Sequence, residues 1–312
     1  MSPMDLTTRY LGLTLAHPFM PGASPLDEDL DMVLRLEDAG ASALVMHSLF
    51  EEEIAGHAAA ADRYLEQLLR IKRRVAIPVI ASLNGTTAAG WLRYASLLQK
   101  GGADALELNV YHVAADPTED AAAVERRVVD IVAVLKESIA IPLAVKLSPF
   151  YSALPHLAAQ LDLIGADGLV LFNRFYQPDI DPVRRQPLPE LRYSDSSELL
   201  LRLRWIALLS GRIHSSLAVT GGVHTPIDAV KALLAGTDAV QMVSALMTGG
   251  PTALTRVRTG VEQWAEEHGY ASIEAMRGAA SAARCANPLD YERANYLEVL
   301  RTARRVARVS GH

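Results

Sequence analysis

One short loop in this sequence carries side chains suited to ligand binding and proton transfer. The apolar run Ala105–Leu108 ends at Asn109, and Tyr111 and His112 follow at once. An asparagine amide donates and accepts hydrogen bonds, so Asn109 is suited to hold a polar ring. A histidine has an ordinary pKa of about 6.5, so His112 is suited to act as a base near neutral pH, unless it only fills the loop.

A lysine closes a second apolar run. Lys146 follows Leu143–Val145, where burying an ammonium is costly unless an anionic partner lies beside it. A flavin would be such a partner, because its ring becomes anionic on reduction. A Schiff-base aldolase would instead use the same lysine as a nucleophile, so Lys146 alone does not separate the two chemistries.

A third group of residues has the pattern of a phosphate site. Gly221 and Gly222 end an apolar run, and Thr225-Pro226 follow as a helix start with a threonine cap and a proline at the first helical position. Another run ends at Ser244. Glycine backbone and helix N-termini both present N–H groups to phosphate oxygens, so we expect phosphate binding here, with a plain turn as the alternative.

Short apolar runs that alternate with amphipathic helices must position these side chains. The runs do not alternate in polarity, which is typical of strands buried on both faces of a parallel sheet. Eight such units predict a single-domain (β/α)8 barrel, the TIM-barrel form of an α/β fold, with its active site at the C-terminal ends of the strands. The expected strands are His17–Met20, Ala43–Met46, Pro78–Ser82, Ala105–Asn109, Leu143–Leu147, Gly168–Phe172, Leu217–Thr220 and Ala239–Met242.

Helical patterns fill the intervals between these strands, and one domain is expected over residues 1–312. The expected helices are Asp27–Ala39, Trp91–Lys100, Thr118–Glu137, Ala153–Ile164, Ser197–Gly211, Pro226–Leu234 and Ala253–Gly269. An extended loop at about 175–196 is either a lid at the catalytic face or a surface excursion. A helical tail from about residue 277 is expected to pack on the barrel or against a second subunit.

Composition excludes several other classes of protein. Of 312 residues, 50% are hydrophobic and 21% charged, which suits a large core, and the net charge of −6 argues against a nucleic-acid surface. Cys285 is the only cysteine, so this chain alone carries no disulfide, cysteine-ligated zinc or iron–sulfur cluster. No signal peptide and no run of about 20 apolar residues is visible, so we expect a cytoplasmic protein without a membrane partner.

Over nearly its whole length, and in matching order, the chain resembles the dihydroorotate dehydrogenase family, closest to its soluble, class 1-like branch. The motifs are His17-Pro18-Phe19-Met20, Glu107-Leu108-Asn109, Val145-Lys146-Leu147-Ser148-Pro149, Thr220-Gly221-Gly222-Val223, Val240–Leu246 and Gly250-Pro251. The resemblance implies an FMN across the barrel mouth and oxidation of dihydroorotate to orotate in pyrimidine synthesis. Hydride transfer to FMN would accompany base-assisted proton removal. A small-molecule substrate and a homodimer are implied as well.

The resemblance also implies roles for particular residues, with no metal among them. Catalytic roles fall on His112 and Lys146, and substrate contacts on Asn109, Asn173 and Arg174. FMN contacts fall on Gly22, Ala23, His47, Ser48, Asn109, Lys146, Gly221, Gly222 and Ser244.

Departures from the family pattern gather on the substrate side. His112 stands where the soluble branch keeps a cysteine base, and Ala114 replaces a substrate-holding asparagine. His47 replaces a flavin-contacting lysine, and Arg174 replaces a serine. The alanine-rich stretch His57–Arg63, expected to be helical, replaces an asparagine- and glycine-rich loop. Flavin binding is thus better preserved than dihydroorotate binding. Two alternatives stay open, a flavin oxidoreductase on another substrate and a phosphate-binding barrel without redox chemistry.

Overall fold

Eight parallel strands form the centre of the molecule, as predicted. The computed structural model describes residues 4–56, 59–85, 88–174 and 177–309. Along the sheet the strands are β3 (Phe19–Pro21), β12 (Ala239–Met242), β11 (Ser216–Thr220), β8 (Gly168–Leu171), β7 (Leu143–Leu147), β6 (Ala105–Asn109), β5 (Val79–Asn84) and β4 (Leu44–Phe50). The N–H and Oγ of Ser42, just before β4, donate to the Phe19 carbonyl at 3.1 and 2.8 Å. This contact brings the two end strands together and closes the barrel.

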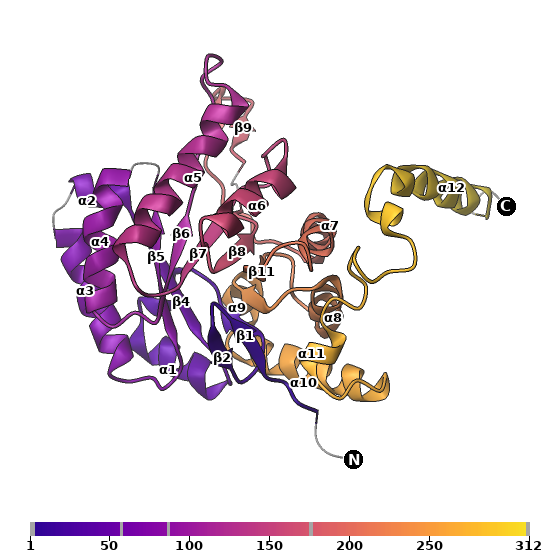
Figure 1. Ribbon diagram of the computed structural model, residues 1–312, viewed down its shortest axis with the longest axis horizontal. Helices are drawn as coiled ribbons and strands as arrows, with labels where there is room; N and C mark the ends of the chain where they lie inside the picture. The colour runs from indigo at the N-terminus through magenta and orange to yellow at the C-terminus, as the bar shows by residue number, and fades with distance from the viewer. Residues whose placement is uncertain (1–3, 57–58, 86–87, 175–176, 310–312) are drawn as a thin grey trace.

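Helices follow the strands and cover the outside of the barrel (Figure 1). They are α1 (Leu30–Asp38), α2 (Glu51–Gly56), α3 (Ala59–Lys72), α4 (Ala88–Lys100), α5 (Ala121–Ser138), α6 (Leu154–Leu163), α7 (Leu199–Leu209), α8 (Pro226–Ala235) and α10 (Thr252–Glu267). Helix α8 begins as the sequence predicts, because Thr225 and Asp228 form a capping box around Pro226. The helix expected over His57–Arg63 is confirmed from Ala59 onward, and residues 57–58 lie outside the described residues.

Small side chains line the barrel interior near the N-terminal ends of the strands. Inward positions hold several alanines, and a two-stranded hairpin, β1 (Thr8–Tyr10) and β2 (Leu13–Leu15), inserts Tyr10 and Leu11 into the space they leave. The hairpin therefore closes the N-terminal end of the barrel. Gly168 suits this fit, since a Cβ there would lie 2.5 Å from Cδ2 of Leu11 and the leucine side chain would have to shift.

Two segments extend beyond the barrel. Part of the loop at 175–196 forms an exposed antiparallel hairpin of β9 (Asp179–Asp181) and β10 (Gln186–Leu188), and Phe175 and Tyr176 lie outside the described residues. The C-terminal tail contains α11 (Ile273–Met276), a 3-10 turn (Pro288–Tyr291) and α12 (Arg293–Val309), and α12 stands apart from the barrel in Figure 1. Within the described part of the chain, no helix is both long and apolar enough to span a membrane.

Candidate active site

A cavity of about 420 Å³ opens at the C-terminal ends of the barrel strands, where a TIM barrel places its active site. Most of the residues predicted from sequence to bind FMN or substrate line this one cavity. They are Ala23, His47, Ser48, Asn109, Lys146, Asn173, Arg174, Gly221 and Ser244. Residues that lie up to 221 positions apart in sequence therefore share one wall because the barrel closes.

Two asparagines and the predicted lysine form a row across three neighbouring strands. Asn84, Asn109 and Lys146 are register partners on β5, β6 and β7 and all three line the cavity. The Oδ1 of Asn109 is buried and has no hydrogen-bond partner among the described residues. A buried acceptor without a partner costs about 1–3 kcal/mol, which a ligand donor would recover. This row is thus suited to bind a polar ring from one side.

Lys146 has an anionic partner inside the protein itself. Its Nζ lies 2.5 Å from Oε1 of Glu107, and the Nε2 of Gln241 donates to the other carboxylate oxygen at 2.6 Å. Glu107 is fully buried and Lys146 is 6% exposed, at the cavity wall. The sequence predicts a flavin as this partner, whereas Glu107, which lies within an apolar run, is a partner inside the protein.

His47 lies on β4, beside a buried carboxylate. Its Nδ1 is 2.8 Å from Oδ2 of Asp27, its backbone N–H donates to Oδ1 of Asp27 at 3.0 Å, and its ring meets the ring of Tyr64 edge-on. Burial disfavours the imidazolium, but the hydrogen bond and charge of Asp27 outweigh it and raise the pKa of His47. His47 is therefore suited to carry positive charge at the cavity wall, where the family has a lysine.

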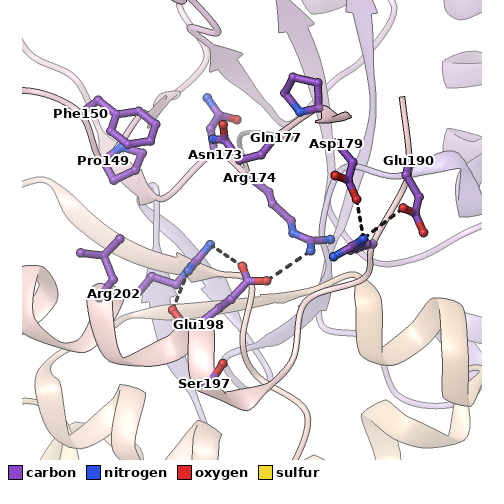
Figure 2. Close-up of a pocket in the computed structure, with 13 residues that line it drawn as sticks. Pro149, Phe150, Asn173, Arg174, Gln177, Asp179, Glu190, Ser197, Glu198 and Arg202 are labelled. Carbon is purple, nitrogen blue, oxygen red and sulfur yellow. Dashed lines mark hydrogen bonds and ion pairs between the residues drawn. The ribbon is translucent and has the colours of Figure 1, made fainter. Parts of the chain in front are cut away.

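Asn173 and Arg174 separate this cavity from a second one of about 570 Å³. The Nδ2 of Asn173 donates to the Val110 carbonyl at 3.3 Å, which orients its side chain. Arg174 forms an ion pair with Glu198 at 3.2 Å, and Figure 2 shows Glu198 between Arg174 and Arg202. An anionic ligand reaching Arg174 must therefore compete with an internal carboxylate.

Ser194, which the sequence did not predict as a site residue, contacts two of the residues expected to bind phosphate. The backbone N–H of Ser194 donates to Oγ of Ser244 at 3.0 Å, and the N–H of Gly222 donates to Oγ of Ser194 at 3.4 Å. Ser194 and Gly221 line the cavity, whereas Gly222 packs against Leu199. Both glycines have positive φ, 82° and 83°, so the turn itself requires them.

The structure does not bring every predicted residue to the cavity wall. His112 is not among the described residues that line it, and its Nε2 lies 3.0 Å from Oε2 of Glu119, which is also paired with Arg127. Those two partners lower the pKa of Glu119, the His112 hydrogen bond most strongly. Gly22 lies behind the wall, where its N–H donates to the Met242 carbonyl at 3.1 Å.

Several cavity residues were absent from the sequence prediction. Asn84 was not selected although it ends β5 just as Asn109 ends β6, and that repeated position was the available signal. Thr220 also ends a strand and lines the cavity. Ser194 gave no signal, because it reaches the site from the long loop and not from a strand end.

The fold and the cavity define a barrel enzyme with a polar site at its mouth, and sequence comparison gives its family. Residues 55–264 match the dihydroorotate dehydrogenase family. The chain is 28% identical over 307 residues to the dihydroorotate dehydrogenase B (NAD(+)) catalytic subunit of Thermoplasma acidophilum, covering 88% of this chain and 99% of that protein.

Two further relatives carry related names. A putative dihydroorotate dehydrogenase A (fumarate) of Aeropyrum pernix is 30% identical over 221 residues, covering 68% of this chain and 71% of that protein. A dihydroorotate dehydrogenase B (NAD(+)) catalytic subunit of Pyrococcus abyssi is 25% identical over 301 residues, covering 88% of this chain and 99% of that protein. The chain therefore belongs to the dihydroorotate dehydrogenase family, whose members are oxidoreductases that act on CH–CH groups.

Proposed function

We propose that this protein is an FMN-dependent oxidoreductase that oxidises dihydroorotate to orotate, a step of pyrimidine synthesis. Family membership supports the reaction class, and one structural observation carries the proposal for the site. That observation is the buried Oδ1 of Asn109, which lacks a partner among the described residues and lies in a cavity with Asn84 and Lys146. Such an arrangement is expected where a polar ring completes the hydrogen bonding.

The residues present fit an FMN. The cavity of about 420 Å³ lies within the size range of cofactor pockets. Lys146 and His47 would hold the ring, and Gly221 with Ser244 would hold the phosphate. A Cβ at Gly22 would lie 3.0 Å from Cβ of Gln241, so this turn behind the wall leaves no room for a side chain. Bound FMN would supply the hydride acceptor for the reaction.

The remaining chemistry falls to this chain's own residues. Asn109 and Asn173 would orient the dihydropyrimidine ring. A base must remove the proton from C5 as the hydride leaves C6. We retain His112 as that base because of its place in the sequence. Its ring is hydrogen-bonded to Glu119, so catalysis would require this hydrogen bond to break and the ring to turn toward the cavity.

Rapid-reaction kinetics test the base. His112→Ala should slow bleaching of the flavin band by dihydroorotate under anaerobic conditions, because proton removal contributes typically 10²–10⁴-fold. Val113→Ala is the matched control, since Val113 neighbours His112, is exposed and carries no titratable group. Equal bleaching rates in wild type and His112→Ala would remove His112 from the mechanism.

One observation favours a second candidate, a flavin oxidoreductase acting on a different substrate. Arg174, at the substrate side of the cavity, is already paired with Glu198 at 3.2 Å. Dihydroorotate is an anion, and it would have to displace this carboxylate. Anaerobic mixing separates the two functions. Bleaching by dihydroorotate supports the first, and a flavin reducible by dithionite but not by dihydroorotate supports the second.

The non-redox alternative and the oligomeric state have separate tests. Purified protein with a yellow, FMN-like absorption spectrum would exclude a barrel that only binds a phosphorylated metabolite. We propose a homodimer from the family resemblance. Light scattering on the eluting protein should give twice the mass of one 33.7 kDa chain.

A further inference from the structure

A buried ion pair lies directly behind the cavity wall. Glu107 on β6 is fully buried, with one carboxylate oxygen 2.5 Å from Nζ of Lys146 on β7 and the other 2.6 Å from Nε2 of Gln241 on β12. Of these three side chains, only that of Lys146 is among the residues lining the cavity. Glu107 is therefore one step removed from any ligand, and it acts on a ligand through Lys146.

Burial makes this carboxylate dependent on its partners. An isolated carboxylate in the barrel interior would be costly to bury, and the contacts with Lys146 and Gln241 offset that cost. The same contact fixes the Lys146 ammonium, which would otherwise rotate on a flexible stem. The pair is neutral overall, so the wall carries far less positive charge than Lys146 alone would give it.

We propose that Glu107 offsets the positive charge of Lys146 beside the cofactor and thereby lowers the reduction potential of the bound flavin. This inference rests on the proposed FMN site. A flavin gains negative charge on reduction, so a nearby positive charge favours the reduced form and a nearby negative charge opposes it. Removing the Glu107 charge should therefore raise the potential.

The test is the midpoint potential of FMN in Glu107→Gln holoenzyme, measured by spectroelectrochemistry. We expect at least a tenfold increase in the preference for reduced over oxidised FMN, which for a two-electron couple is a rise of about 30 mV. Glutamine has nearly the same shape as the glutamate that it replaces.

Two variants accompany this measurement. Glu107→Asp keeps the charge but withdraws the carboxylate toward β6, so the potential should rise by less than with Gln. If Glu107→Gln does not fold, this smaller rise tests the proposal alone. Ala144→Gly is the matched control, because Ala144 is the register partner of Glu107 on β7, is buried and carries no charge. Its potential should equal that of wild type.

The outcomes distinguish this inference from the proposed function. A folded Glu107 variant that binds FMN with the wild-type potential, or a lower one, overturns the role of Glu107. An equal rise in Ala144→Gly also overturns it, since packing and not charge would then be the cause. Wild-type protein that binds no FMN refutes the proposed function instead. That result is visible before any variant is compared, from FMN titration by fluorescence.

Discussion

Asp27→Asn should lower the pKa of His47 and so favour its neutral form. Asp27 is 1% exposed and meets His47 twice, at 2.8 Å through the ring Nδ1 and at 3.0 Å through the backbone N–H. Burial alone would lower the pKa of His47, and Asp27 reverses this. Asparagine keeps the shape and the acceptor for the backbone N–H but loses the charge, so burial should dominate in the variant.

The expected size follows from the contact that is lost. A hydrogen bond to a charged group contributes about 1.5–3 kcal/mol, so its loss should lower the pKa of His47. Since the folded protein raises this pKa, the linked stability is fully present below about pH 6.5 and is lost as the pH rises through the folded-state pKa. The free energy of unfolding of the wild type should therefore exceed that of the variant most at acid pH, and this difference should shrink as the pH rises.

NMR titration of the imidazole protons measures this pKa directly. The chain has nine histidines, so a His47→Gln spectrum identifies the resonance of His47. Asp31→Asn is the matched control, because Asp31 is exposed on the same segment and should leave the titration of His47 unchanged. An Asp27→Asn protein whose His47 titrates at or above the wild-type value would refute the electrostatic reasoning.

Three further predictions concern stability in urea or heat. Gly222→Ala should destabilise by more than the roughly 1–2 kcal/mol of a left-handed residue, because its Cβ would lie 2.5 Å from the backbone N of Leu199. Gly269→Ala, also at positive φ but with nothing within 4 Å, should show only the conformational cost, and equal losses would contradict the collision. Burial lowers the pKa of His17 to about 4, so stability should fall by about 3 kcal/mol as pH drops from 6.5 toward 4. His17→Gln should flatten that curve, and an unchanged curve would disprove the assignment. Tyr10→Phe should destabilise by about 0.5–1.5 kcal/mol, since the fully buried Tyr10 hydroxyl interacts with the side chain of Gln241, and an unchanged unfolding free energy would show that this contact contributes nothing.

The order of strands and helices was readable from the sequence because each element has its own local pattern. Lys146 and Asn109 could be selected for the same reason, as polar residues that end apolar runs. It could not be predicted from the sequence which side chains of these strands point into the barrel and which point outward. Both faces of a buried parallel strand are apolar, so the alternation that marks an exposed face is missing.

Contacts between distant segments could not be predicted either. Glu107 precedes Gln241 by 134 residues, and only closure of the barrel brings their side chains within 2.6 Å. Ser194 reaches Ser244 and Gly222 from a loop whose path no local pattern specifies. His112 shows the opposite case, because its place in the sequence suggested the cavity while Glu119 and Arg127 hold the ring elsewhere.

The sequence by itself determined the barrel, the residues at its strand ends and the family. These depend on hydrophobic periodicity and on short motifs, and both are local properties of the chain. Tertiary structure decided which of those residues share a cavity and which charges meet inside it. Electrostatic interactions depend on distance and burial, and neither is set until the eight strands have closed around one another.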